Sequence, residues 1–265
     1  MQAFVINLAT ATDRWVFVHK SITQSSLCIT RVAAVDAMTI SLPHPAFAAR
    51  QYRWFHGRKI NPRELACYLS HLKALQAFLD TGEEHGLVAE DDIVLRPDFD
   101  SSLAAALQRS NQWNILRLTG LSAAHPMRVA RLAGDRDLCV HFGRLKGAGA
   151  YVVDRTAARA LLKRLLPMRL PFDHAIDREW RQGLTAASIF PFPVSQTESD
   201  FLSSVQPGTW PRLSRTRRYL TTYPYQALNE VSRWFYRGFH ALRIGLGHPA
   251  TAPSKRPRVS PKTKV

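Results

Sequence analysis

Short apolar runs of strand length alternate along this chain with longer segments of helical character. The runs are rich in β-favouring side chains and are bounded by turn residues or by charge. They lie at residues 3–8, 27–34, 86–89, 113–118, 148–153 and 186–190. Helices are expected at residues 10–24, 61–80, 98–110 and 156–166. Strands that alternate with helices are typical of an α/β fold with a mainly parallel central sheet.

Three stretches depart from this alternation. Residues 41–59, with prolines among aromatic and basic side chains, are expected to form an irregular loop that could move over a site. Residues 128–142 are expected to form a hairpin or an excursion from the sheet. Residues 171–180 are expected to form a loop that enters a short helix. These stretches still belong to one main domain, predicted over residues 1–206.

The C-terminal part of the chain is expected to form two further segments. Pro207 to Pro211 marks the predicted boundary. Residues 207–248 are predicted to form a basic, amphipathic helical extension, and residues 249–265, rich in Pro, Lys and Ser, a disordered basic tail.

Composition limits the class of protein. A chain of 265 residues with 46% hydrophobic content can bury a full core. No run of apolar residues reaches transmembrane length, and the N-terminus lacks the pattern of a signal peptide. Cys28, Cys67 and Cys139 are odd in number and widely spaced, which favours a reduced, cytoplasmic chain.

The formal net charge of +16 is concentrated at the C-terminal end. From Arg212 onwards there are twelve Lys or Arg and one acid, a net of +11, whereas the first 211 residues carry 24 bases and 19 acids, a net of +5. A basic tail favours binding to nucleic acid, to an anionic membrane surface or to an acidic partner.

Residues 225–246 combine this charge with helical periodicity. Apolar side chains recur at Leu228, Val231, Phe235, Phe239, Leu242 and Leu246, while Arg233, Arg237, His240 and Arg243 occupy other faces. We expect a basic amphipathic helix that lies on an anionic bilayer, at the inner face of the cytoplasmic membrane. The alternative is a helix packed on the main domain with its charges solvated.

Three consecutive acids, Glu90, Asp91 and Asp92, close the apolar run that begins at Gly86. Carboxylates this close together raise each other's pKa, and a divalent cation relieves the repulsion. Hard Mg²⁺ or Mn²⁺ suits such oxygen ligands, usually together with phosphates, and ligands of open α/β sheets bind at the carboxyl ends of strands. The pattern indicates a metal–diphosphate site, with a solvated acidic turn as the alternative.

The segment from Asn61 has a strong helix start, because Asn61 is a capping residue and Pro62 follows at the first helical position. Its apolar stripe is expected at Leu65, Leu69, Leu72, Gln76 and Leu79. Beside that stripe, one face carries Glu64, Cys67, Tyr68 and His71. His71 is predicted either to bind a ligand or to be an ordinary buried histidine. Cys67 and His71 could also ligate zinc, which the absence of a second suitably spaced pair disfavours.

Two later motifs supply further candidate residues. Gly147 to Tyr151 places small residues where a backbone can approach a ligand, or where a helix packs closely on a strand. Asp173 and Asp177 are four residues apart. Asp173 is a candidate general base or a hydrogen-bond acceptor for a substrate hydroxyl, with a plain helix N-cap as the alternative.

Five segments occur in an order that is known from one family: Phe4 to Leu8 with Arg14, Arg63 to His71, Leu87 to Asp92, Gly147 to Ala158, and Pro171 to Asp173. Over roughly residues 3–200, the chain resembles family 25 glycosyltransferases. These are bacterial lipopolysaccharide or lipooligosaccharide glycosyltransferases related to the collagen galactosyltransferases. The Glu-x-x-Cys-x-x-Ser-His block, followed about twenty residues later by Glu-Asp-Asp, is the most specific part of the resemblance.

The resemblance implies a GT-A-like, Rossmann-like nucleotide-sugar-binding fold, with the main domain as the catalytic domain. It implies transfer of a hexose, typically galactose from UDP-galactose, to a saccharide or lipid-linked oligosaccharide acceptor with inversion to a β-linkage. Mn²⁺ or Mg²⁺ would be the cofactor, held by Asp91 and Asp92. The other site residues that it implies are Asn7 and Arg14 near the nucleotide, Glu64, Ser70, His71 and Gly149 at the sugar, and Asp173 and Glu90 as catalytic groups, with Asp173 as the base.

The chain departs from the family pattern at two places. Ala89 stands where a larger aliphatic residue is more usual, and residues 120–145 match no acceptor-side pattern. An inactive member that binds lipid or sugar is one alternative function. A nucleic-acid-binding protein is the other, which the segregation of basic residues to the tail disfavours.

Overall fold

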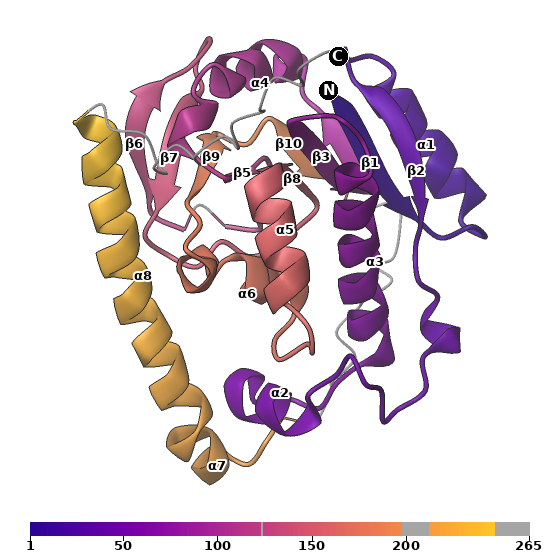
Figure 1. The fold of residues 1–265 in the computed structure, drawn as a ribbon, viewed down its shortest axis with the longest axis vertical. Coiled ribbons are helices and arrows are strands. Elements are labelled where there is room, and N and C mark those ends of the chain that lie inside the picture. Colours follow the sequence, from indigo (N-terminus) through magenta and orange to yellow (C-terminus); the bar gives the residue numbers. More distant parts are fainter. Residues whose placement is uncertain (123, 198–211, 247–265) are drawn as a thin grey trace, which may run out of the picture.

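The computed structural model describes residues 1–122, 124–197 and 212–246, and shows an α/β protein (Figure 1). Its main sheet has eight strands in the order β2-β1-β3-β8-β5-β9-β7-β6. Their bounds are β1 Gln2–Asn7, β2 Cys28–Ala33, β3 His85–Glu90, β5 Ile115–Arg117, β6 Pro126–Arg131, β7 Asp137–His141, β8 Ala150–Asp154 and β9 Ala186–Phe190. A separate antiparallel pair, which the sequence did not predict, consists of β4 (Ile93–Leu95) and β10 (Val194–Gln196).

The main sheet is mixed, with most strands in one direction. β1 is parallel to both β2 and β3, and β5 is parallel to β9. β8 is antiparallel to β3 and β5, and β7 is antiparallel to β6 and β9. Only β7 and β8 therefore run against the other strands of this sheet. This confirms the predicted α/β class, and β6 and β7 form the predicted hairpin.

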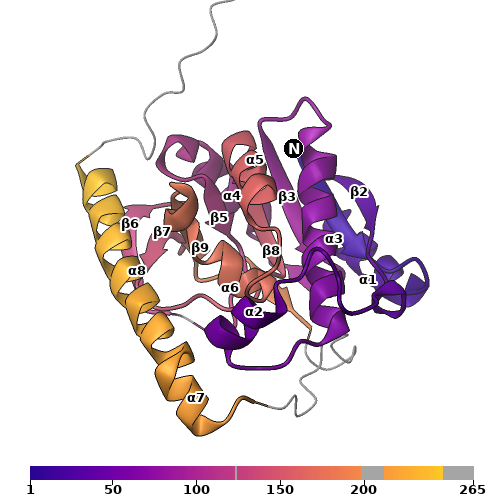
Figure 2. The ribbon, with the colours of Figure 1, turned by 60° about the horizontal axis from the view of Figure 1, so that its bottom comes forward.

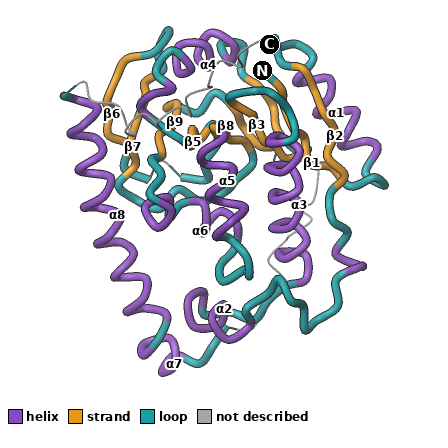
Figure 3. The backbone as a smooth tube through the Cα atoms, viewed as in Figure 1, coloured by secondary structure: helices purple, strands orange, loops and turns teal. Residues whose placement is uncertain are grey.

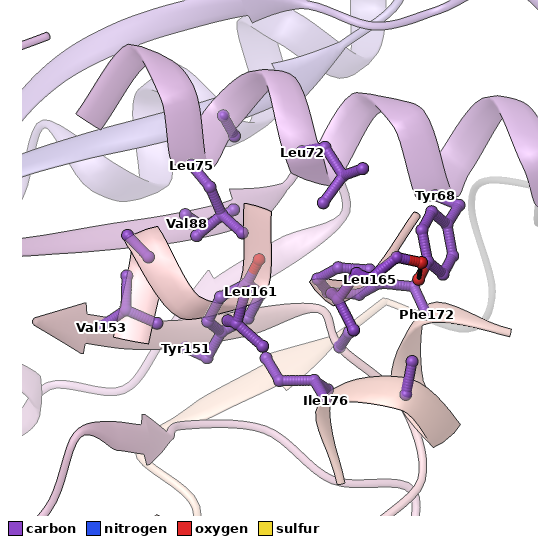
Figure 4. Packing of buried hydrophobic residues seen from close by; sticks show 14 of the residues in the cluster. Tyr68, Leu72, Leu75, Val88, Tyr151, Val153, Leu161, Leu165, Phe172 and Ile176 are labelled. Carbon is purple, nitrogen blue, oxygen red and sulfur yellow. Dashed lines mark hydrogen bonds between the residues drawn. The ribbon is translucent and has the colours of Figure 1, made fainter. Parts of the chain in front are cut away.

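Helices cover both faces of the sheet (Figure 3). Phe4 and Ile6 of β1 point into a cluster with α3 (Pro62–Leu79) and α5 (Arg155–Arg164), whereas Ala3 and Val5 point into a second cluster with α1 (Thr12–Ile22) and α4 (Phe99–Leu107). Because successive side chains of a strand alternate between faces, strands covered on both sides are apolar throughout. Figure 4 shows the first cluster, between α3, α5 and β8.

The segment predicted as an irregular loop, residues 41–59, contains a helix, α2 (Ala49–His56). Tyr52 anchors this helix, because its side chain is fully buried and its ring contacts that of Phe47 at 5.3 Å between centroids. Gly57 ends the helix in the left-handed conformation, with φ of 75°. The prediction of a loop was wrong because it weighed the preceding prolines and not this C-terminal glycine.

Helix α3 begins as predicted, with the Asn61 side chain accepting a hydrogen bond from the backbone N–H of Arg63 at 2.9 Å. Its buried stripe differs from the predicted one. Gln76 is exposed, whereas Tyr68 and His71, which were expected beside the stripe, are each 1% exposed. The core side of α3 is therefore rotated towards β8 and α6 (Phe172–Ile176), so that His71 stacks on Phe172 with 4.0 Å between ring centroids.

The predicted C-terminal helix exists, but it packs on the domain through its basic side and leaves its apolar side exposed. Helix α8 (Thr222–Gly245) follows the short α7 (Arg215–Leu220) and lies along β6 and β7 at the far edge of the sheet (Figure 1, Figure 2). Arg233, Arg237 and His240 are buried against the domain, and the apolar stripe is exposed. The alternative of a helix packed on the domain is therefore confirmed, whereas the expectation of solvated charges on α8 is wrong for these three residues. The predicted boundary at Pro207 to Pro211 and the tail 249–265 lie outside the described residues.

Buried ion pairs hold α8 in this orientation. Arg237 Nε donates to Glu179 Oε1 at 2.7 Å, and Arg237 Nη2 donates to Asp177 Oδ1 at 2.9 Å. Arg237 Nη1 also donates to the His141 carbonyl at 2.8 Å. Arg233 Nη2 lies 3.1 Å from the other oxygen of Asp177. Asp177 is thus part of the attachment of α8 to the domain.

Replacing Arg237 with alanine is expected to lower the free energy of unfolding by about 3–5 kcal/mol, because Asp177 and Glu179 stay buried without their cation. Arg217→Ala, an exposed change on α7, is the control and is expected to cost less than about 0.5 kcal/mol. Denaturant unfolding of both variants measures the difference. Equal stability of the two variants would contradict the account.

His240 makes the stability depend on pH. Burial, Arg237 and Arg243 lower its pKa from 6.5 to about 4, so the folded protein keeps the imidazole neutral where the unfolded chain protonates it. Stability from this group is therefore full above pH 6.5 and is lost as the pH falls towards 4. Between pH 7 and pH 5, the wild type should lose about 2 kcal/mol more than His240→Leu. Parallel pH profiles of unfolding free energy would exclude this effect.

Candidate functional site

The three predicted acids lie at the carboxyl end of β3, beside the end of β1. Glu90 is the last residue of β3, and it is paired in the parallel register with Ile6 of β1. Asn7 follows Ile6 as the last residue of β1. Because neighbouring parallel strands end at the same edge, Asn7 meets the acids although 84 positions separate it from Asp91.

Asp91 is held by the two residues predicted to lie near a nucleotide. Asn7 Nδ2 donates to Asp91 Oδ2 at 2.7 Å, and Arg14 of α1 forms an ion pair with the same carboxylate. Arg14 Nη2 also lies 3.5 Å from Asp92 Oδ2. The structure therefore brings Asn7 and Arg14 together with Asp91 and Asp92. Arg31 of β2, which was not predicted, donates to Asn7 Oδ1 and orients its amide.

Gln196 of β10 bridges the other two acids. Its Nε2 donates to Asp92 Oδ1 at 3.2 Å and to Glu90 Oε2 at 3.4 Å. On the other side of Glu90, His71 Nε2 lies 3.3 Å from Oε1, and His71 Nδ1 lies 3.2 Å from the hydroxyl of Tyr151. His71 is thus buried, as the alternative of an ordinary buried histidine predicted, but its partners are Glu90 and Tyr151. Its place is beside the acids.

The acids retain uncompensated negative charge. Burial raises the pKa of Asp92 to about 6, and Glu90 and Asp91 add to the shift. Burial also raises the pKa of Asp91, although Asn7 and Arg14 act in the opposite direction. Folding therefore places these carboxylates where a further positive charge would be favourable.

The donor set of this cluster fits the predicted cofactor. Asp91 and Asp92 offer carboxylate oxygens, which hard cations such as Mn²⁺ and Mg²⁺ prefer. Among the described residues, Cys67, His71 and Glu90 form a second group whose ligand atoms all lie within 4.8 Å of one another. Glu90 is thereby a third candidate ligand beside the Cys67–His71 pair, which sequence spacing alone did not show. This mixed sulfur, nitrogen and oxygen set suits a softer ion such as Zn²⁺.

The helix face predicted to line a sugar site is only partly available. Burial raises the pKa of Glu64, whose carboxylate accepts a hydrogen bond from the Tyr52 hydroxyl of α2. Ser70 is 1% exposed; its hydroxyl donates to the Ala66 carbonyl at 2.7 Å and accepts from the Val35 N–H at 2.8 Å. The Ser70 hydroxyl therefore joins α3 to the loop after β2.

Cys67 lies where the separate motifs meet. Burial raises the pKa of its thiol, and four carboxylates raise it further: Glu90, Asp173, Glu64 and Asp92. These groups come from α3, from the end of β3 and from α6. Three of the motifs that the sequence singled out, those of Glu64, Glu90 to Asp92 and Asp173, therefore contribute charge at Cys67.

Asp173 lies in the first turn of α6, where Pro171 is the N-cap residue, so the plain N-cap alternative is wrong. Its oxygens accept from the backbone N–H of Gly147 at 3.1 Å and of His174 at 2.9 Å. Burial alone would raise the pKa of Asp173, but His174, the Gly147 N–H and Arg117 outweigh it and hold the pKa below its usual value. Asp173 is therefore ionised at neutral pH.

Gly149 has a steric role that neither sequence interpretation named. A Cβ at this position would lie 2.5 Å from Cδ of Gln196, closer than real contacts allow. The absence of a side chain lets Gln196 reach Glu90 and Asp92. Gln196 itself was missed because a lone glutamine on a short strand carries no sequence signal.

The comparison with protein families decides the identity of this arrangement. The model of a family described as "Glycosyltransferase family 25 (LPS biosynthesis protein)" matches residues 1–176. The chain belongs to glycosyltransferase family 25. The resemblance stated from the sequence is thereby confirmed, and the family match includes the acids, the α3 block and Asp173. Gln196, α7 and α8 lie beyond it.

Solved structures give more distant similarities. The galactosyltransferase LgtC, in complex with donor and acceptor sugar analogs, is 14% identical with a TM-score of 0.34, and 60% of each chain is covered. A glycosyltransferase involved in glycosylation of the major capsid of PBCV-1 is 9% identical with a TM-score of 0.32, covering 62% of this chain and 65% of that one. The inositol-1-phosphate CTP transferase from T. maritima is 12% identical with a TM-score of 0.39, covering 77% and 92%. These similarities are too weak to carry an argument about substrate.

The contact of Gly149 with Gln196 gives a direct test of the site's construction. Gly149→Ala in this family 25 member is expected to cost about 1–3 kcal/mol of unfolding free energy, because the added methyl group displaces the Gln196 amide. In a Gln196→Ala background the same change should cost much less. A thermodynamic cycle of the two changes measures the coupling, and strictly additive costs would show that Gln196 does not lie against Gly149.

Proposed function

We propose that this family 25 member transfers a hexose, galactose from UDP-galactose, to a saccharide acceptor of the lipopolysaccharide core or lipooligosaccharide type. The reaction is metal-assisted and inverts the anomeric carbon to a β-linkage. The observation that carries this proposal is the group of three acids at the carboxyl end of β3, where two raised pKa values favour a bound cation.

Asp91 and Asp92 are the proposed ligands of Mn²⁺ or Mg²⁺, which when bound would offset charge on the departing diphosphate. Arg14 lies between the two carboxylates and supplies a second positive charge at the same place. Asn7 keeps Asp91 in position through its amide. These residues together form the proposed diphosphate end of the donor site.

Glu64, His71 and Gly149 are proposed to border the donor sugar. Ser70 supports this side of the site by joining α3 to the loop after β2. His71 holds Glu90 from one side and Gln196 holds it from the other, so the Glu90 carboxylate has a fixed orientation. A fixed carboxylate beside the metal ligands can orient a sugar hydroxyl through a hydrogen bond. This is the role that we assign to Glu90.

Asp173 is the proposed base for the acceptor. Its ionised carboxylate takes the proton of the acceptor hydroxyl while that oxygen bonds to the anomeric carbon and the bond to the diphosphate breaks. A carboxylate of low pKa is a weak base, so proton transfer would lag behind formation of the new bond. Glu64, whose pKa is raised by burial, is a second carboxylate near Asp173 and Cys67.

Asp92→Ala is expected to fold normally and to lose metal-dependent transfer, because one of the two carboxylate ligands is removed. Asp13→Ala, an exposed acid on α1, is the matched control and should retain full activity. Turnover of UDP-galactose with Mn²⁺ measures both variants. Full activity of Asp92→Ala would contradict the proposed metal site.

Cys67→Ser separates the two possible metal groups. If the cation lies on Asp91 and Asp92, this variant keeps its Mn²⁺ dependence, since the thiol is not a ligand. Metal titration of the turnover rate makes the comparison. Loss of metal activation in Cys67→Ser, with Asp92→Ala unaffected, would assign the metal to the Cys67–His71–Glu90 group.

Asp173→Asn tests the base. It is expected to lower kcat by roughly a hundredfold or more while the KM for the donor changes little, because proton transfer is lost and donor binding is not. Glu90→Gln is the comparison, and it should raise the donor KM as well. A small effect on kcat at Asp173 with a large one at Glu90 would exchange the two roles.

A further inference from the structure

The exposed apolar residues of this protein are concentrated on its C-terminal helices. Among the described residues, nine of the sixteen large apolar side chains that are exposed lie between residues 219 and 246. We call them the outer stripe: Tyr219, Leu220, Leu228, Val231, Trp234, Phe235, Phe239, Leu242 and Leu246. Their exposed fractions range from 53% to 78%. A patch of this kind marks an interaction surface.

The buried ion pairs fix which face of α8 points outward. From Leu228 onwards the outer stripe recurs every three or four residues, apart from the adjacent pair Trp234 and Phe235. Arg233 and Arg237 point towards the domain and bind Asp177 and Glu179. Rotating α8 to bury its apolar side chains would leave these two acids buried without a cation. Buried charges that lose their partner are strongly destabilising, and this opposes such a rotation.

Positive charge flanks the outer stripe. Arg212, Arg215 and Arg217 are exposed at the α7 end. Beyond residue 246 the sequence adds five Lys or Arg and no acid. The one acid from residue 212 onwards, Glu230, forms ion pairs with Arg144 and Arg233. From residue 212 onwards the sequence therefore combines apolar and aromatic side chains with cations, and its one acid is already paired.

We propose that the outer stripe is a membrane-docking face, which lies in the interface of an anionic bilayer with its apolar side chains among the acyl chains. Aromatic and aliphatic residues on one face of a helix, with basic residues nearby, are typical of helices that lie in a membrane interface. No helix among the described residues is long and apolar enough to cross a membrane. Binding is therefore along the surface, as expected for the amphipathic helix from the sequence, and it rests on the apolar face.

A second copy of the chain fits this face less well. Each chain carries a net charge of +16, and an antiparallel pair of α8 helices would bring the α7 arginines of one copy towards the basic C-terminal sequence of the other. That arrangement costs electrostatic energy, whereas an anionic bilayer neutralises both ends. The proposal does not depend on the transferase reaction.

Co-sedimentation of the full chain with vesicles tests the proposal. Wild type should bind vesicles of phosphatidylcholine with phosphatidylglycerol more tightly than vesicles of phosphatidylcholine alone. Phe235→Gln combined with Phe239→Gln should lower the partition coefficient by about tenfold or more, because two exposed aromatic side chains leave the bilayer. The control is Met38→Gln combined with Leu121→Gln, exposed apolar residues far along the chain from α8, which should bind as wild type does.

The position of Trp234 provides a second readout. Its fluorescence, taken as the difference between wild type and Trp234→Phe, should be quenched by lipids brominated in their acyl chains. No binding of wild type to anionic vesicles at low salt overturns the proposal. It is also overturned if the Phe235 and Phe239 changes leave binding intact, or if they convert a dimer into a monomer in sedimentation velocity. The last result would assign the stripe to a second copy.

Discussion

Three carboxylates at the end of a buried strand repel one another, and much of the site is arranged to hold them there. Asn7 and Arg14 bind Asp91, Gln196 bridges Glu90 and Asp92, and His71 supports Glu90 from the α3 side. These contacts come from four separate segments of the chain. Even with them, burial keeps the pKa values of Asp91 and Asp92 raised, and this supports our proposal that the cluster binds a cation.

The sequence predicted the parts of the site that follow from local patterns. Glu90 to Asp92 end an apolar strand, and Asn61 with Pro62 starts α3, because strand ends and helix caps leave short signals. Contacts between residues that are far apart in the sequence leave no such signal. Gln196 reaches the acids only because Gly149 has no side chain, and Tyr52 reaches Glu64 from a helix that was taken for a loop.

The lack of a local signal for distant contacts also explains why the buried side of α8 was not predicted. Periodicity shows correctly that its apolar and basic residues lie on different faces, but which face is buried depends on partners elsewhere in the chain. Asp177 and Glu179 are 60 and 58 residues away from Arg237, and they draw the basic side inward. A buried arginine paired with two acids thus overrides the usual rule that apolar faces point to the core.

The proposed function requires that the acids at the end of β3 bind a nucleotide sugar through a divalent cation. Calorimetric titration of the protein with UDP-galactose, UDP-glucose and UDP-N-acetylglucosamine, with and without Mn²⁺, tests it most directly. We expect binding of UDP-galactose that requires Mn²⁺ and is absent in Asp92→Ala. Failure of a folded sample to bind any of these donors in the presence of Mn²⁺, or equal binding without the metal, would contradict it.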